Sequence, residues 1–182
     1  MRKFVAGLFI TVDGVVESPD KWQFPYFNDE MGQAVTSQMD AADAMLLGRQ
    51  TYQQFASFWP NADAADPFTA RMNNTPKSVV STTLDTVEWQ NSTLIRSNVA
   101  EELTRLKQQP GKDIAITGSA TLIRSLLRDN LLDELRLLVH PVVVGSGKRL
   151  FPDGSDPVAL KLVGAQTFST GVLSLTYQPA ST

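Results

Sequence analysis

The chain has 182 residues, a formal net charge of −3, one histidine and no cysteine. This length suits one domain with a sizeable core, and we expect residues 1–182 to form it. The lack of cysteine excludes disulfides, zinc–thiolate sites and thiolate catalysis, and one histidine excludes sites that need two imidazoles. We expect no metal site. The near-balanced charge also lacks the basic footprint of a nucleic-acid binder.

The first residues, MRKFVAGLFITVDG, are basic and then apolar, as in a signal peptide. However, the apolar run is short and ends at Asp13 without a small-residue cleavage pattern. No stretch approaches the roughly 18–20 apolar residues of a membrane span. The sequence therefore predicts a first core strand at residues 3–10 and a cytoplasmic protein without membrane contact.

The hydrophobic pattern predicts strands that alternate with helices over the first two thirds of the chain. Strands are expected at residues 3–10, 44–47, 77–82, 93–96, 113–117 and 135–144, with a closing hairpin at 160–168 and 172–177. Helices are expected from residue 28 or 29 to about 42, at 51–59, from 98 to about 109 and from 118 to about 128, with a short one near 68–72. This order implies right-handed crossovers and one mixed, mainly parallel sheet of about eight strands, flanked by about four helices in an α/β domain.

Two helix starts carry capping signals. Asn28 or Asp29 is expected to cap the first helix, because short polar side chains accept hydrogen bonds from the open amides of a first turn. Asn98 and Glu101 have the spacing of a capping box, with asparagine in place of serine or threonine.

Three small or polar junctions follow predicted strands. They are Gly48-Arg49-Gln50-Thr51, Ser81-Thr82-Thr83 and Gly118-Ser119-Ala120-Thr121. In open parallel sheets, ligands bind beyond the carboxyl ends of the strands, where helix N-termini gather. Glycines permit close backbone approach, and hydroxyls with a guanidinium bind phosphate. The junctions therefore predict a groove for a diphosphate or a phosphorylated nucleotide, although a lone glycine and arginine can simply be a turn and a solvated charge.

The usual nucleotide fingerprints are missing. No GxGxxG follows the first strand, and Gly145 and Gly147 are followed by Leu150 where a third glycine is needed. The stretch that ends at Lys148 also lacks the earlier glycine and the Ser or Thr of a P-loop. A conventional Rossmann domain or P-loop NTPase is therefore not expected.

Four stretches carry a resemblance that covers nearly the whole chain. They are ITVDGVVES (10–18), LLGRQTYQQF (46–55), KSVVSTT (77–83) and ITGSATLIRSLLRDNLLDELRLLVHPVVVGSGKRLF (116–151). The chain resembles the dihydrofolate reductase superfamily, in the branch related to the reductase (C-terminal) domain of the bifunctional riboflavin-biosynthesis deaminase-reductase. The resemblance implies a dihydrofolate reductase-like fold and an NADPH-dependent reductase of a small planar heterocycle, of the pteridine or 5-amino-6-ribosylaminouracil type. It also makes a homodimer an expectation.

The resemblance implies which residues meet the cofactor. The phosphates are expected at Gly48, Arg49 and Thr51, and the adenosine side with its 2′-phosphate at Ser81, Thr82 and Thr83. The diphosphate cradle is expected at Gly118, Ser119, Ala120, Thr121 and Leu122, and the nicotinamide side at Ala6, Gly14 and Val16. One departure is Ser119, which stands where dihydrofolate reductases usually continue a glycine run.

The proton donor stays unassigned. Reduction needs an acid near the pocket, and Asp13, Asp29 and Glu30 are the candidates. Dihydrofolate reductases carry a carboxylate on the helix before the glycine–arginine junction, but the matching position here is Gly32. Asp29 is equally well explained as a helix cap and Asp13 as a turn residue. Classical folate reduction is therefore weakened.

The substrate side rests on fewer signals. Trp22, Phe27 and their neighbours either cover a planar ring or pin a loop to the core. Lys148 is a candidate for a substrate phosphate, beside the simpler reading of a strand-end turn. His140, which lies in an apolar strand, is better explained as a packed, hydrogen-bonded histidine than as a proton donor.

Two other functions remain open at this stage. One is a reductase of the same fold that acts on another small carbonyl, imine or xenobiotic. The other is a non-catalytic module that binds NADPH or a pterin, which the missing carboxylate favours. A domain that binds no nucleotide would require both glycine junctions to be architectural only.

Overall fold

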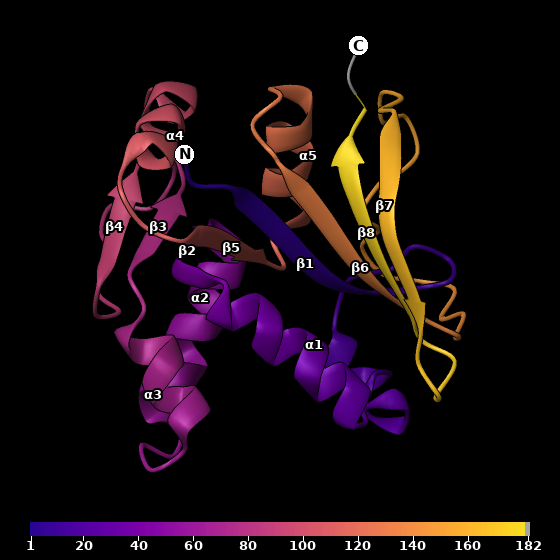
Figure 1. Cartoon of the computed structure of the whole chain (residues 1–182). Coiled ribbons are helices and arrows are strands. Elements are labelled where there is room, and N and C mark those ends of the chain that lie inside the picture. Colours follow the sequence, from indigo (N-terminus) through magenta and orange to yellow (C-terminus); the bar gives the residue numbers. More distant parts are fainter. Residues whose placement is uncertain (181–182) are drawn as a thin grey trace.

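The structure is a computed structural model that describes residues 1–180; residues 181 and 182 of the expected domain lie outside the described part. One eight-stranded sheet runs through it in the order β4-β3-β2-β5-β1-β6-β8-β7 (Figure 1). The strands are β1 (Phe4–Thr11), β2 (Ala42–Gly48), β3 (Lys77–Val80), β4 (Ser92–Ile95), β5 (Asp113–Thr117), β6 (Glu134–His140), β7 (Leu160–Thr167) and β8 (Leu173–Pro179). The α-helices are α1 (Asp29–Asp40), α2 (Arg49–Phe58), α3 (Pro67–Asn74), α4 (Val99–Gln108) and α5 (Ala120–Arg128).

The pairing confirms the predicted fold class. The six strands from β4 to β6 pair in parallel, and β8 pairs antiparallel with both β6 and β7. Parallel neighbours need long crossovers, which helices supply except between β3 and β4, where residues 81–91 form a loop, whereas β7 and β8 need only a short turn. The result is one mixed, mainly parallel α/β sheet that ends in an antiparallel hairpin.

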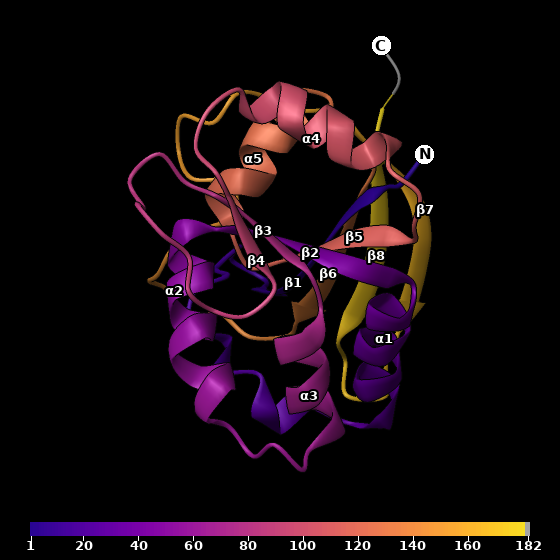
Figure 2. The same ribbon diagram turned by 90° about the vertical axis from the view of Figure 1, so that its left-hand side faces the viewer.

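Helices cover the sheet in two groups. Helices α4 and α5 lie on one side and α1, α2 and α3 on the other (Figures 1 and 2). Leu103 of α4 and Ile123 of α5 join the core cluster that contains Phe4 and Leu135. On the opposite face, Tyr52 of α2 packs with the smaller cluster around Met72 and Val79. Successive residues of each strand thus serve the two faces in turn.

The observed helix caps agree only in part with the caps predicted from the sequence. Asn28 caps α1 as predicted, with its side-chain oxygen accepting from the Met31 amide at 3.0 Å. The predicted capping box at Asn98 is wrong, because Asn98 has a left-handed backbone (φ 50°) and its side chain makes no cap hydrogen bond. Asp66, which the pattern did not single out, accepts from the Phe68 and Thr69 amides and starts α3.

Three boundaries differ from the prediction. Helix α2 begins at Arg49 rather than at residue 51, because Gly48 is extended (φ −79°, ψ 167°) and the helix starts directly after it. Strand β6 ends at His140 instead of Val144, where Pro141, which cannot donate to a ladder, follows. The loop before β3 contains α3, which is longer than the predicted short helix.

One face of the terminal hairpin carries apolar side chains without a covering helix. We call it the hairpin face, and the register places Leu162 beside Tyr177, Ala165 beside Leu175, and Leu173 at its end. Leu162 is 50% exposed and Leu173 39%. No charged residue lies among these five, so the hairpin face is the place in the described fold where an apolar sheet surface meets solvent.

Candidate active site

The three predicted junctions meet in one cleft. Strands β3, β2 and β5 are neighbours in the sheet, so their carboxyl ends lie side by side. Residues from all three junctions line a cleft of about 1940 Å³, which is larger than the usual range of small-molecule sites. Its size suits a dinucleotide together with a second, smaller ligand. The predicted residues that line it are Val16, Gly48, Arg49, Thr51, Ser81, Thr82, Thr83, Gly118, Ser119, Ala120, Thr121 and Leu122.

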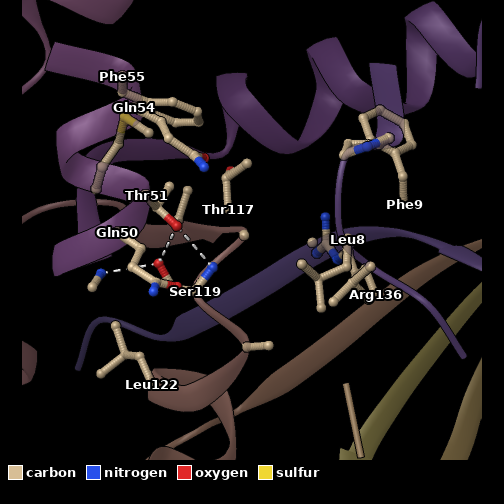
Figure 3. Close-up of a pocket in the computed structure, with 18 of the residues that line it drawn as sticks. Leu8, Phe9, Gln50, Thr51, Gln54, Phe55, Thr117, Ser119, Leu122 and Arg136 are labelled. Atoms are coloured by element: carbon tan, nitrogen blue, oxygen red, sulfur yellow. Dashed lines mark hydrogen bonds between the residues drawn. The ribbon is translucent and has the colours of Figure 1, made fainter. Parts of the chain in front are cut away.

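A hydrogen-bond network joins the first and third junctions (Figure 3). The Thr51 hydroxyl oxygen accepts from the Ser119 amide at 3.0 Å and lies 2.9 Å from the Ser119 hydroxyl. That hydroxyl oxygen in turn accepts from the Gly48 amide at 2.9 Å. Ser119 has a left-handed backbone (φ 57°), and Gly118 before it also has a positive φ of 62°. The network therefore fixes the spacing between the start of α2 and the start of α5.

Gly118 is required both by its positive φ and by the small space beside Thr51. A Cβ at this position would lie 3.0 Å from the Thr51 hydroxyl oxygen, in addition to the strain of its positive φ. The third glycine that dinucleotide folds often use is replaced here by Ser119, whose side chain supplies the network. This explains physically the departure from a glycine run.

The second junction is a turn that presents two hydroxyls. The buried Ser81 hydroxyl oxygen accepts from the Thr83 and Leu84 amides at 3.2 and 3.1 Å. Thr82 and Thr83 are exposed at the cleft. Ser81 therefore shapes the turn, and its two neighbours offer hydroxyl groups to a ligand.

The charged residues that line the cleft are mainly cations, although the whole chain has a net charge of −3. Its lining cations are Arg49, Arg71, Arg124, Arg128, Arg136, Lys148 and Arg149, against the carboxylates Glu17, Asp20 and Asp129. No carboxylate of residues 1–180 lies within 4.0 Å of the exposed Arg49 guanidinium, which contacts only Gln53 at 3.4 Å. An excess of cations in a concave site raises its affinity for anions.

Two residues expected beside the nicotinamide lie outside the cleft. Ala6 is fully buried with the core cluster on the α4–α5 side of the sheet. Gly14 turns the loop after β1 with a φ of 83°, and its carbonyl accepts from the Leu150 amide at 3.1 Å. Gly7, which the sequence reasoning missed, lines the cleft in place of Ala6. A one-residue shift along a strand changes the face, which explains the error.

Of the predicted substrate residues, two line the cleft and one does not. Trp22 does not line the cleft; its indole nitrogen donates to the Glu17 carbonyl at 3.2 Å and its ring packs against His140. Phe27 lines the cleft and is half exposed. Lys148 also lines it, and its ammonium donates to the Gln50 side chain at 2.8 Å. The aromatic pair therefore separates into one loop anchor and one cleft residue.

The candidate acids lie outside the cleft. The Thr11 hydroxyl, 2.5 Å away, and the Gly145 amide at 2.9 Å hold the pKa of Asp13 below its usual range. The Ser169 amide and hydroxyl do the same for the pKa of Glu30. Asp29 is exposed in the first turn of α1. Asp13 and Glu30 are thus ionised loop anchors, poorly suited to donate a proton.

His140 is the packed histidine that the sequence favoured. It is fully buried, Nδ1 lies 2.8 Å from the Leu138 carbonyl, and Nε2 has no partner within the described residues. The rings of Phe9, Trp22 and Tyr26 surround it edge-on at 5.0–5.8 Å. Burial lowers its pKa and keeps the imidazole neutral.

Residues 1–180 offer neither a metal site nor a membrane-spanning helix. No cluster of three or more His, Cys, Asp and Glu side chains in that range could hold a metal ion. In the same range, no helix is long and apolar enough to cross a membrane.

The sheet order and the cleft at its carboxyl edge define a protein of the dihydrofolate reductase-like class. More closely, the chain belongs to the RibD C-terminal domain family, which matches residues 2–174. It is 34% identical over 182 residues to the uncharacterized protein YyaP of Bacillus subtilis. The alignment covers 97% of this chain and 94% of that protein. The uncharacterized protein YwjB of the same organism is 27% identical over 174 residues, covering 94% and 95%.

Solved structures show the same fold at low identity. A Shewanella sp. PV-4 protein superposes with a TM-score of 0.79 at 18% identity, covering 98% of this chain and 99% of that one. The Thermotoga maritima diaminohydroxyphosphoribosylaminopyrimidine deaminase/5-amino-6-(5-phosphoribosylamino)uracil reductase gives 0.68 at 15% identity, covering 98% of this chain and 57% of that one. A dihydrofolate reductase from Enterococcus faecalis, complexed with NADP(H), gives 0.66 at 15% identity, covering 98% and 97%.

Proposed function

We propose that this protein is an NADPH-dependent reductase of a small planar heterocycle, of the kind that riboflavin biosynthesis uses. The observation that carries the proposal is the cation-rich cleft in which all three phosphate-type junctions meet. Family membership and the fold shared with an NADP(H)-bound dihydrofolate reductase support it. An anionic dinucleotide is the ligand that best matches this charge and length.

The residues that would hold the cofactor follow from their positions. Arg49 and the exposed hydroxyls of Thr82 and Thr83 suit the 2′-phosphate end, because they form the cation and donors at the β2 and β3 ends. The start of α5, at Ala120 and Thr121, offers open amides to the diphosphate. Val16 and Gly7 border the end of the cleft that is left for the nicotinamide.

In the proposed reaction, the cofactor supplies a hydride to an electrophilic carbon of a C=N or C=O bond. A proton completes the new N–H or O–H bond, so that C=X, NADPH and H⁺ give CH–XH and NADP⁺. Asp13, Asp29 and Glu30 do not line the cleft. Of the carboxylates that do, Glu17 accepts from the Lys148 amide at 3.1 Å, Asp129 accepts from the Arg128 guanidinium at 3.1 Å, and Asp20 is exposed to solvent. We therefore propose that water delivers this proton.

The cofactor assignment is tested by thermal unfolding with NADPH, NADH or neither. At about one hundred times its dissociation constant, NADPH should add roughly 2.7 kcal/mol of stability, and NADH at the same concentration should add less. Arg49→Met should weaken NADPH binding by about tenfold or more, since a charge-assisted bond to phosphate is worth about 1.5–3 kcal/mol. Arg105→Met, which removes an exposed cation of α4 outside the cleft, is the matched control and should leave NADPH binding unchanged.

A non-catalytic binding module is the second candidate, favoured by the missing carboxylate at Gly32. Stopped-flow loss of NADPH absorbance with aminouracil and pteridine acceptors separates the two. Turnover supports the reductase. Tight NADPH binding without oxidation by any acceptor, including simple aldehydes and imines, supports the module. The absence of stabilisation by either cofactor contradicts both the reductase and the module.

We also propose that the protein forms a homodimer through the hairpin face. Its side chains are uncharged, so two copies of the face are complementary to each other without any matched ion pair. Leu162→Lys should shift the protein from dimer to monomer in sedimentation equilibrium, because it buries a charge in the contact. Gln166→Lys adds the same charge to the same strand on its other face and should leave the dimer intact. A wild-type monomer at high concentration contradicts the proposal.

A further inference from the structure

A row of polar residues crosses the sheet beneath α1. Gly7 of β1 pairs with Thr117 of β5 and with Arg136 of β6, and Arg136 pairs with Thr176 of β8. Paired residues of neighbouring strands point to the same face, and all four residues line the cleft. Thr117 of this row adjoins the third junction, whereas Figure 3 shows Arg136 at the end of the pocket opposite Thr51 and Ser119.

A glutamine side chain from α1 rests on the middle of this row. A Cβ at Gly7 would lie 2.3 Å from both the Nε2 and the Oε1 atoms of Gln38. A larger residue at position 7 would therefore displace the carboxamide from this place. Gln38 lines the cleft and is partly buried, and no hydrogen bond joins its carboxamide to another group of residues 1–180. Its two donors and one acceptor are thus directed to a ligand or to water.

The neighbouring guanidinium is held in place. Arg136 Nε and Nη2 donate to the same Glu134 oxygen at 3.1 and 2.8 Å, and the other carboxylate oxygen lies 3.5 Å from the Lys3 ammonium. Two cations therefore share one buried carboxylate, which leaves a net positive charge. Arg136 is 33% exposed, and its Nη1 edge has no partner in the described part of the chain. The guanidinium offers donors in a fixed direction.

The two groups select one type of ring edge. A carboxylate on α1, as dihydrofolate reductases have, accepts two hydrogen bonds and suits a ring edge with two donors. Here Arg136 only donates, while Gln38 can accept. This pair matches a lactam edge, in which a carbonyl oxygen stands beside a ring N–H. Phe9 and Leu138, one row further along the same face, border the space for the ring itself.

We propose that Gln38 and Arg136 are the specificity residues for the acceptor: Arg136 donates to a ring carbonyl and Gln38 accepts from the adjacent ring N–H. The inference rests on the proposed reductase function and refines its substrate to a pyrimidine or pteridine ring that carries a carbonyl beside a ring N–H. Gly7 is conformationally ordinary and is required for space alone.

The test measures binding of lumazine (pteridine-2,4-dione) and of 3-methyllumazine, which lacks the N–H between the two carbonyls. Their fluorescence is titrated with the NADP⁺-loaded protein. Wild type should bind lumazine about tenfold or more tightly than 3-methyllumazine, because a site built to accept an N–H rejects an analogue without it. Gln38→Met, which preserves side-chain length, should discriminate the two by less than about twofold.

The second residue and the control complete the design. Arg136→Met should weaken both lumazines by about tenfold or more, and Arg105→Met, an exposed position of α4 outside the cleft, should behave as wild type. If wild type and Gln38→Met discriminate equally between lumazine and 3-methyllumazine, the assignment of Gln38 is overturned. A residue of merely structural importance would not change the preference for the one N–H by which these ligands differ.

Thermal unfolding with NADPH separates this inference from the function on which it rests. Gln38→Met and Arg136→Met should retain the full NADPH stabilisation of wild type. If NADPH stabilises the protein but lumazine does not bind, the lactam site is wrong and the reductase proposal stands. If NADPH gives no stabilisation and lumazine does not bind, both are overturned.

Discussion

Replacing Lys77 with methionine is expected to lower the free energy of unfolding by about 1–3 kcal/mol, the cost of leaving buried carbonyl groups without their donor. Only 2% of Lys77 is exposed. Its ammonium donates to the carbonyls of Asn73, Thr75 and Gln90 at 2.7–3.1 Å and lies 4.0 Å from the centre of the Trp89 ring. Two of these carbonyls stand at the C-terminal end of α3, where backbone acceptors lack helical partners.

Urea unfolding of the two proteins at pH 7 measures this loss. Lys161→Met, the same change on the exposed strand β7, is the matched control and should change the free energy by less than about 0.5 kcal/mol. A loss at Lys77 no larger than that at Lys161 would show that water replaces the ammonium at the three carbonyls.

The same lysine has a pH signature. Burial lowers its pKa to about 8, below the ordinary value, so between about pH 8 and pH 10 the unfolded chain binds more protons than the folded one. The free energy of unfolding therefore rises with pH in this window through Lys77. In Lys77→Met this contribution to the rise should be absent.

The fold was accessible from sequence because its signals are local and repeated. Short apolar runs alternate with helical patterns, and the handedness of crossovers leaves few arrangements for such an order. The strand β5 and helix α5 came out within two residues of their predicted bounds. Predictions failed where a single residue determines the local structure. Asn98 is a residue type that often caps helices but has a left-handed backbone, and Pro141 ends β6 earlier than predicted.

The cofactor side of the cleft was largely predictable for a related reason. Each junction follows its own strand, so parallel pairing alone brings Gly48, Ser81 and Gly118 to one edge. The face of β1 was not predictable in this way. Ala6 and Gly7 are both small, and only the register with β6 shows that Gly7 points to the cleft.

The missed residues depend on contacts between distant segments. Gln38 follows the buried Met31 by seven residues, on the face of α1 that packs on the sheet, and its meaning comes from the missing side chain of Gly7. Arg136 sits in an otherwise apolar strand, which was a usable signal: a charged residue there needs a buried partner, and Glu134 is that partner. Nothing local distinguishes Lys77 from an exposed strand lysine.

Thr51→Val should both destabilise the fold and weaken NADPH binding, because the Thr51 hydroxyl joins the two junctions. Its removal leaves the Ser119 amide and hydroxyl without their acceptor, and each orphaned buried donor costs about 1–3 kcal/mol. We expect the free energy of unfolding to fall by about 2–4 kcal/mol in urea titrations. Thr104→Val, the same change on the exposed face of α4, is the control and should be within about 0.5 kcal/mol of wild type.

A double-mutant cycle with Ser119→Ala identifies the network as the cause. Because both side chains serve one set of hydrogen bonds that also holds the Gly48 amide, the double variant should lose less than the sum of the single losses, by about 1 kcal/mol or more. Additive losses would mean that Thr51 and Ser119 act independently. NADPH affinity should follow the same pattern, since the spacing of the α2 and α5 starts decides whether both can reach one diphosphate group.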